Sequence, residues 1–398
     1  MSDKFLHGVE VIEIDAGPRP IQTVRSSVIG IVGTAPLADE AAFPLNTPVL
    51  VAGSLREAAR LVAREDSAGK GAGTLPAALD SIFDQAGAVV VVIRVEQGEN
   101  DSATLANVIG GVNARTGNYE GVKALLGAES RLGVVPRILI APGFTHQRES
   151  TANAVVSELV GVAERLRAVV IADGPNKTDE AVTTYAGDFG SARVMVVDPW
   201  VLKVNDKGVT EPQPASPCVA GLIAKVDNDE GFWVSPSNRT INGIVGTVRP
   251  VDFTLGDANA RANLLNEKKV ATIVRQEGYR LWGNRSLSSD PKWAFLCVRR
   301  TADMINESLL RGHLWAVDRG ITKTYLEDVT EGVNAYLRSL AAKGAIIKGE
   351  CWADPELNTP DQIAQGKVYF DFDFTPVYPA EHVTFRSHLT NKYLTEIF

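Results

Sequence analysis

The residues that could perform nucleophilic catalysis are few in this 398-residue chain. A serine hydrolase needs a hydroxyl nucleophile, a histidine base and a carboxylate that orients the histidine. Of the five histidines, His146 is the one that lies among alternating strands and helices, and Ser150 follows it closely. A hydrolase that uses His146 with Ser150 or Asp173 is therefore one interpretation. No Gly-Thr-Ser-Met-Ala or His-Gly-Thr passage is present, and we interpret His146 instead as a polar loop residue.

Sites for phosphate, dinucleotides and metals are not predicted. The glycine-rich run 69–74 follows a helix, whereas a P-loop follows a buried strand and ends in Gly-Lys-Ser or Gly-Lys-Thr. The segment 30–33 lacks the spacing of a dinucleotide fingerprint. The acidic run 227–231 lacks the downstream glutamate of a calcium loop. The sequence therefore predicts no cofactor, no metal site and no enzymatic activity.

Composition limits the partners. Acidic residues outnumber basic ones by 48 to 40, and the net charge of −8 argues against nucleic acid as the main partner. The longest apolar run, Ala86–Ile93, is far shorter than the ~18 residues of a membrane helix, so we expect no membrane insertion. Cys218, Cys297 and Cys351 have no paired spacing, and we expect them to be reduced, partly buried thiols.

Strands and helices alternate in the first part of the chain. The predicted strands are Ala88–Val95, Arg137–Ala141, Ala168–Ala172 and Arg193–Asp198, and the predicted helices are Ser54–Glu65, Thr74–Ala86, Thr151–Arg167 and Thr178–Ala186. Apolar strands separated by helices of this length indicate right-handed crossovers and a mainly parallel sheet that helices cover on both faces.

The pattern changes at about residues 245–260, where we expect a domain boundary. The later predicted elements are the helices Ala260–Glu267, Thr301–Arg311 and Lys323–Ala342 and the strands Val270–Arg275, Trp293–Val298, Lys367–Phe374 and His382–Arg386. Nineteen of the 27 aromatic residues follow Gly231, so the best-packed core is expected to be C-terminal.

The last two predicted strands should pair with each other. Alternation places Val368, Phe370 and Phe372 on one face of the first strand, and Val383 and Phe385 on the inner face of the second. We expect this antiparallel pair to lie on a helical layer, which makes a compact α+β domain.

Both ends of the chain are expected to be strand arms. Val9–Ile14 is strand-like, and the elbow Gly17–Pro20 prevents a tight hairpin back onto it. The segment Thr390–Phe398 is apolar at its tip. Each arm has backbone groups that need a partner, either in its own chain or at the sheet edge of another copy. The residues alone leave both alternatives open.

The passage Gly278–Arg300 reads GYRLWGNRSLSSDPKWAFLCVRR, and it contains none of the patterns of a catalytic or ligand site. It resembles the "WGxRTL…D…W…VRR" segment of the contractile tail sheath proteins of myophages and R-type pyocins. Three further passages resemble the same family in the same order: His7–Pro36, Pro217–Val245 and Gly349–Phe385. Asn284, Ser286 and Cys218 depart from the commoner residues of these passages.

The resemblance implies a multidomain α/β and α+β protein with a subtilisin-like central domain. It implies an N-terminal arm at 1–20, an outer α/β region at 21–250, a C-terminal domain facing a tube at 251–389, and a C-terminal arm at 390–398. The implied function is structural. Subunits would form sixfold rings stacked helically around an inner tube, and contraction would drive the tube through a target cell envelope.

The resemblance also implies partners and residue roles. The partners are other copies of the chain, the tail tube protein, and baseplate and tail terminator proteins. The particle would be a virion or a tailocin assembled in the host bacterial cytoplasm. The arm residues would be Val9, Val11, Ile14, Tyr393, Leu394 and Ile397, the acceptor residues Val368, Phe370, Phe372, Val383 and Phe385, and the tube-facing residues Lys323, Glu331, Arg338 and Lys343.

Overall fold

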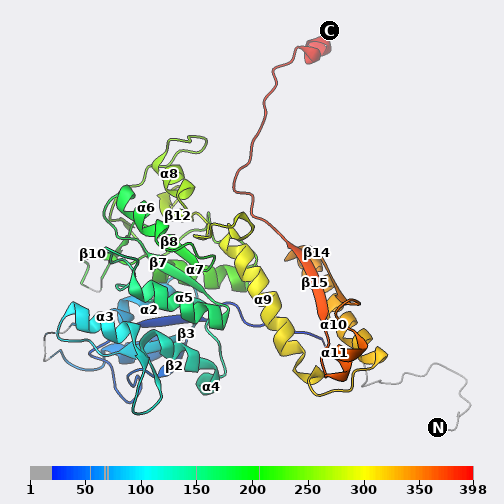
Figure 1. Cartoon of the computed structure of the whole chain (residues 1–398). Helices are drawn as coiled ribbons and strands as arrows, with labels where there is room; N and C mark the ends of the chain where they lie inside the picture. Colours follow the sequence, from blue (N-terminus) through cyan, green and yellow to red (C-terminus); the bar gives the residue numbers. More distant parts are fainter. Residues whose placement is uncertain are drawn as a thin grey trace, which may run out of the picture.

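A computed structural model describes residues 20–53, 55–66, 69, 71–148, 150–205 and 207–397. The chain forms an α/β body and a smaller C-terminal lobe, and α9 (Leu296–Gly312) lies between them (Figure 1). The predicted arm Val9–Ile14, with Val9, Val11 and Ile14, lies outside the described residues. In the described part of the chain, no helix combines the length and apolar character that a membrane crossing requires.

An eight-stranded sheet in the order β13-β12-β8-β7-β6-β1-β3-β2 forms the centre of the body. Its strands are β1 (Ile29–Thr34), β2 (Pro48–Ala52), β3 (Val89–Val95), β6 (Ile138–Ile140), β7 (Val169–Asp173), β8 (Val194–Val197), β12 (Val270–Arg275) and β13 (Tyr279–Trp282). Strands β12 to β3 in this order are parallel, and β13 and β2 pair antiparallel at the two edges. The predicted, largely parallel sheet is therefore confirmed.

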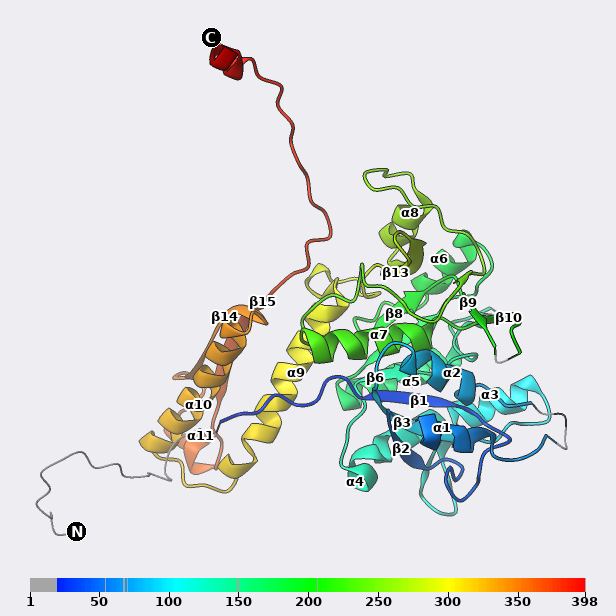
Figure 2. The same cartoon turned by 180° about the vertical axis from the view of Figure 1, so that it is seen from behind.

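Helices cover both faces of this sheet (Figure 2). Alternate residues of one strand point to opposite faces, so Val90 and Val92 of β3 join one core while Val91 and Ile93 join the other. Helices α2 (Leu75–Phe83) and α7 (Ser216–Asp229) cover the first face, and α3 (Asp101–Ile109), α5 (Ala154–Leu166) and α6 (Asp179–Gly187) cover the second. The expectation of a best-packed core in the C-terminal part is wrong, because the two largest clusters of buried side chains lie in the body. There, aliphatic side chains far outnumber the buried rings of Phe43, Phe144 and Tyr185.

Smaller elements complete the body. They are β4 (Gly111–Val112) paired with β5 (Tyr119–Glu120), the sheet of β9 (Val201–Val204), β10 (Thr210–Gln213) and β11 (Gly246–Thr247), and the helices α1 (Leu55–Ala58), α4 (Ala128–Leu132) and α8 (Arg261–Glu267). The helix expected at Ser54–Glu65 is shorter, because α1 continues as a 3₁₀ helix over Ala59–Val62. Strands β12 and β13 continue the large sheet, so the expected boundary near 245–260 does not end it.

The C-terminal lobe consists of α10 (Lys323–Ala342), β14 (Ile346–Ala353), α11 (Pro360–Ala364) and β15 (Phe370–Pro376), packed against α9. Strands β14 and β15 pair antiparallel, and Phe370, Phe372 and Phe374 lie on the lobe core. Ile21 and Val24 also pack there, so the chain crosses from the lobe to β1 near its start.

Three expectations for the C-terminal part are wrong. Trp293–Val298 is not a strand, because a 3₁₀ turn ends at Trp293 and α9 begins at Leu296. Strand β15 pairs with β14 and not with the expected strand His382–Arg386. A register shift between Ile346 and Lys348 interrupts the alternation of β14, so the sequence did not predict this strand. His382–Arg386 does not pair, and its Val383 and Phe385 are 63% and 92% exposed rather than inward.

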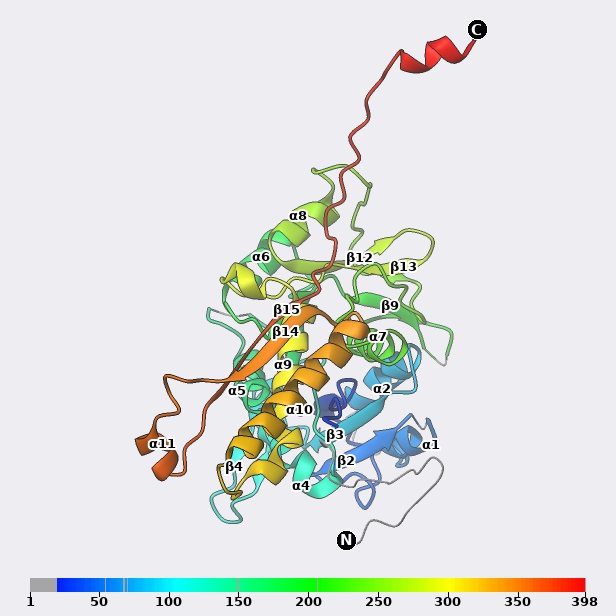
Figure 3. The same ribbon diagram turned by 90° about the vertical axis from the view of Figure 1, so that its right-hand side faces the viewer.

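Residues 377–391 form an extended tail, and a 3₁₀ helix follows at Lys392–Ile397. In Figures 1 and 2 the tail runs away from both the body and the lobe, and in Figure 3 its end lies beyond them at the top of the view. Over the described part of the predicted arm Thr390–Phe398, the single subunit therefore has a 3₁₀ helix at Lys392–Ile397 rather than a strand. Its predicted arm residues Tyr393, Leu394 and Ile397 are all exposed.

Candidate assembly interfaces

The passage around Trp282 and Gly283 is built for close packing. Gly283 follows β13 with a φ of 125°, and a Cβ at this position would lie 2.9 Å from Cα of Ala271. Only glycine tolerates both that conformation and that approach to the neighbouring strand β12. Ser286 then donates its hydroxyl to the carbonyl of Trp293 at 2.6 Å. These residues position backbone and leave no free catalytic group.

A row of buried ion pairs attaches α9 to the body. Asp303 accepts two hydrogen bonds from Arg193, at 2.5 and 3.1 Å, and both side chains are nearly inaccessible. One turn later, Glu307 lies 2.9 Å from Arg137. Burial works against the Glu307 carboxylate, yet the hydrogen bond from Arg311 and the charge of Arg137 hold its pKa below the usual value. Helix α9 is thus fixed to the sheet by paired charges.

Arg285 anchors the root of the tail. Its Nε donates to Oε1 of Glu381 at 2.8 Å, and its Nη2 donates to Oε2 of the same carboxylate. The guanidinium also lies 5.4 Å from the centre of the Phe295 ring, which contacts Tyr378 edge-on. Sequence reasoning missed this role, because the two ion-pair partners are separated by 96 positions.

The predicted acceptor residues divide into two groups. Phe370 and Phe372 lie in β15 on the lobe core, and Val368 precedes that strand. Val383 and Phe385 lie instead in the tail. Among the described residues, β14 and β15 pair only with each other, so each has an outer edge whose backbone groups have no strand partner. The edge of β14 is partly capped, because the side-chain amide of Asn334 bonds to the backbone N–H and C=O of Cys351 at 2.8 and 3.0 Å. Two edges without a strand partner therefore lie in the lobe that was predicted to receive the arms.

The predicted tube-facing residues Lys323, Glu331, Arg338 and Lys343 all lie exposed on α10 or at its end. Arg338 lies 3.3 Å from Glu331, and Lys323 lies 3.6 Å from Glu327. The face is thus charged and accessible, as expected. Its contact with a tube stays a prediction.

The candidate hydrolase residues are not assembled into a triad. Asp173 at the end of β7 accepts from the hydroxyl of Ser216 at 2.6 Å and lies 3.3 Å from the hydroxyl of Thr145. Burial raises the pKa of Asp173 to about 6. His146 stacks edge-on against Trp200 at 4.8 Å, and its Nδ1 has no hydrogen-bond partner among the described residues. Burial and the charge of Lys177 lower the pKa of His146. Ser150 is exposed.

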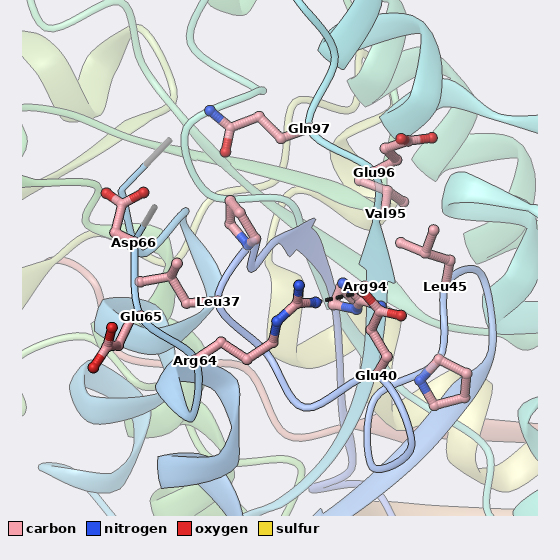
Figure 4. Close-up of a pocket in the computed structure, with 12 residues that line it drawn as sticks. Leu37, Glu40, Leu45, Arg64, Glu65, Asp66, Arg94, Val95, Glu96 and Gln97 are labelled. Atoms are coloured by element: carbon pink, nitrogen blue, oxygen red, sulfur yellow. Dashed lines mark hydrogen bonds and ion pairs between the residues drawn. The ribbon is translucent and has the colours of Figure 1, made fainter. Parts of the chain in front are cut away.

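A cavity of about 460 Å³ lies at the ends of β1 and β3 (Figure 4). The buried Arg94 donates to the carbonyl of Phe43 at 2.5 Å, and Arg64 pairs with Glu40 at 2.5 Å across the opening. Both arginines of the cavity are thus bonded within the chain, and the lining residues include no serine, cysteine or histidine. Within the described residues, no group of three or more His, Cys, Asp or Glu side chains could hold a metal ion.

Two family models cover most of the chain. The phage tail sheath protein central domain matches residues 117–287, and the phage tail sheath C-terminal domain matches residues 288–390. The chain belongs to the phage tail sheath family. It is 38% identical to the tail sheath protein of Escherichia phage P2 over an alignment of 405 residues. This alignment covers 100% of this chain and 98% of that protein. It is also 47% identical over 397 residues to a Pseudomonas aeruginosa (strain UCBPP-PA14) protein described as a prophage major tail sheath protein, covering 99% and 98%.

Solved sheath structures share the fold of this sheath protein. The contracted helical sheath of the anti-feeding prophage superposes with a TM-score of 0.69 at 20% identity, covering 97% of this chain and 100% of that chain. The contracted PVC sheath of an extracellular contractile injection system gives a TM-score of 0.69 at 16% identity, covering 98% and 99%. The chain is a structural subunit of a contractile tail sheath and not an enzyme, and the hydrolase interpretation is set aside.

Proposed function

We propose that this sheath subunit polymerises as sixfold rings stacked helically around an inner tube, and that contraction of the polymer drives the tube through a target cell envelope. The observation that carries the proposal is the combination of two lobe strands whose outer edges have no strand partner with an extended tail that has no strand partner among the described residues. One subunit would thus supply both a segment that can be added to another copy and a strand edge that can accept such a segment.

Backbone chemistry supports the exchange. Residues 382–390 form no backbone hydrogen bonds to the backbone of the described residues. The lobe sheet has only two strands and is stabilised by its packing against α10, and each added strand would satisfy further backbone donors and acceptors. Addition of the tail and of the arm Val9–Ile14 to the edges of β14 and β15 would complete the sheets of neighbouring copies. Contraction would then repack rigid bodies that remain joined by these strands.

The remaining partners follow from family membership. We infer contacts with a tail tube, through the charged face of α10, and with baseplate and tail terminator proteins. One of the related structures is itself an anti-feeding prophage baseplate. The particle would be a virion or a tailocin that is assembled in the host bacterial cytoplasm. The subtilisin-like description of the central domain stays a prediction that the parallel sheet supports.

Negative-stain electron microscopy of the purified chain tests the proposal. The full-length subunit is expected to form regular tubes, and a subunit shortened after Pro379 is expected to stay unassembled while keeping its circular dichroism spectrum. Soluble monomers from the full-length chain at high concentration would contradict polymerisation. Regular tubes from the shortened chain would contradict a role for the tail.

A further inference from the structure

The root of the tail, residues 376–381, is a stiff segment that leaves the subunit surface at its last residue. Pro376 and Pro379 are half-buried, whereas every residue in 381–390 is exposed. The backbone N–H of Glu381 donates to the carbonyl of Pro379 at 3.0 Å. Because proline fixes its own φ, the two prolines leave the root few free torsions. The point at which the tail becomes free of the subunit is therefore Glu381.

Two contacts hold this point against the body. The guanidinium of Arg285 donates through Nε and Nη2 to both carboxylate oxygens of Glu381. The ring of Phe295 meets the ring of Tyr378 edge-on, with their centres 6.5 Å apart, and Arg285 lies 5.4 Å from the centre of the Phe295 ring. A two-point bond between planar groups fixes orientation as well as distance. We call these four residues the tail-root latch.

The body side of the latch is rigid. The segments that carry Arg285 and Phe295 form a bridge with backbone hydrogen bonds of 2.8 and 2.9 Å. The N–H of Leu287 donates to the carbonyl of Val194 in β8 at 3.0 Å. Arg285 is thus attached to the large sheet and does not follow movements of the tail. The latch therefore fixes the tail root relative to the body.

The contacts of the latch are accessible to solvent and can open. The side chains of Arg285 and Glu381 are 36% and 37% exposed. An exposed ion pair contributes little to stability, and salt screens it. Residues 382–390 make no backbone hydrogen bond to the backbone of the described residues. Opening of the latch would therefore change the direction of the tail and leave the packing of the body and the lobe intact.

We propose that Arg285 is a positioning residue for assembly. When the latch is closed, it fixes the direction in which the tail leaves the subunit, and when it opens, the root can turn toward a neighbour in another position. A subunit that offers its tail in one direction meets its neighbour in one geometry. The latch thus sets the arrangement of linked copies rather than the strength of their link. This inference rests on the proposed joining of copies through the tail and names what directs it.

Electron spin resonance distances in the full-length chain, kept unassembled at low concentration, test the latch. The labels are placed at Ser387→Cys in the tail and at Glu267→Cys on α8, because the three native cysteines are buried. The parent chain is expected to give one narrow distance distribution. Arg285→Ala should broaden it, with the ratio of latched to open tails falling about tenfold, the combined size of an exposed ion pair and a cation–π contact. High salt should broaden the distribution of the parent chain and leave that of the variant unchanged.

Matched variants separate the latch from a general effect on structure. Arg285→Lys keeps the charge and loses the two-point bond, so it should broaden the distribution less than Arg285→Ala. Arg285→Glu with Glu381→Arg should recover most of the narrow distribution, whereas each of these changes alone should not. Arg239→Ala is the control, because its ion pair with Glu230 lies on the body and is 41% exposed on both sides. It should leave the distribution unchanged, and all variants should keep the urea midpoint of the parent chain.

Negative-stain microscopy of the same variants connects the latch with assembly. Arg285→Ala is expected to give short or irregular polymer, and the paired charge exchange should recover regular tubes. A distribution as narrow in Arg285→Ala as in the parent chain would overturn the latch. A broadened distribution together with regular tubes would overturn its role in assembly and leave the joining of copies through the tail standing. Regular tubes from the chain shortened after Pro379 would instead contradict that joining itself.

Discussion

At the scale of single residues, the attachment of α9 depends on carboxylates that neutralise buried arginines. Asp303 contacts both Arg193 and Arg299, and its side chain is 1% exposed. Removal of one partner from a buried pair costs far more than the pair itself contributes, because the other charge remains buried.

Asp303→Ala is therefore expected to lower the free energy of unfolding by about 3–5 kcal/mol, since it leaves the buried Arg193 with only the exposed Glu164 as an acidic partner. Urea denaturation of unassembled subunits measures the change. Glu331→Ala is the matched control, because its pair with Arg338 is exposed, and it should cost less than ~0.5 kcal/mol. Similar losses in the two variants would show that the buried pair does not hold α9.

Asp173 should give the fold a measurable pH dependence. Burial raises its folded-state pKa to about 6 from an ordinary 3.8, so the folded chain retains a proton that the unfolded chain has lost between these values. Stability from this group is therefore full below about pH 4 and is lost as the pH rises to about 6. Relative to Asp173→Asn, the wild-type unfolding free energy should fall by roughly 3 kcal/mol across this window. Parallel profiles would contradict the raised pKa.

Sequence could predict the chemistry of residues better than their partners. The lack of a triad pattern around His146 argued against a hydrolase. In the structure, the carboxylate of Asp173 accepts hydrogen bonds from Ser216 and Thr145. The pair between Arg285 and Glu381 could not be predicted, because ion pairs between distant segments leave no periodic signal in one sequence.

At the scale of elements, the N-terminal arm should be dispensable for folding and required for assembly. Ile21 and Val24, just beyond it, pack on the lobe core. Deletion of Met1–Pro20 should therefore leave a folded, soluble subunit that forms no tubes. Circular dichroism and negative-stain microscopy measure the two properties. Regular tubes from the truncated chain would show that exchange does not use this arm.

The exposed face of α10 should dock the tube through charge. Arg338→Glu with Lys343→Glu is expected to weaken co-assembly with the tube protein at low salt, while stability changes by less than ~0.5 kcal/mol because both side chains are exposed. Co-sedimentation at low and high salt measures docking. Co-assembly that stays unchanged at both salt concentrations would contradict a role of this face in docking the tube.

Periodicity predicted most elements whose apolar pattern is regular. Helix α10 has the expected bounds, and β3, β7 and β12 lie where alternating or continuous apolar runs predicted them. The misses occurred where two patterns compete. The run Trp293–Val298 is apolar enough for a strand, but it leads into the helical stripe of α9. The register shift at Ile346 hid β14.

At the scale of the whole molecule, α9 joins the body and the lobe into one unit, and we propose that strands link this unit to its neighbours. The elbow at Gly17–Pro20 and the prolines at the root of the tail would absorb changes of direction during contraction. The strand register should be conserved, because a one-residue slip would turn Val383 and Phe385 away from the lobe core.

Electron cryomicroscopy of the assembled sheath, before and after contraction, tests this claim most directly. We predict that β14 and β15 are flanked by strands from other copies, and that the tail keeps the same partner strand and the same register in both states. A lobe sheet that remains two-stranded in the polymer, or a tail that changes partner or register between the two states, would contradict it.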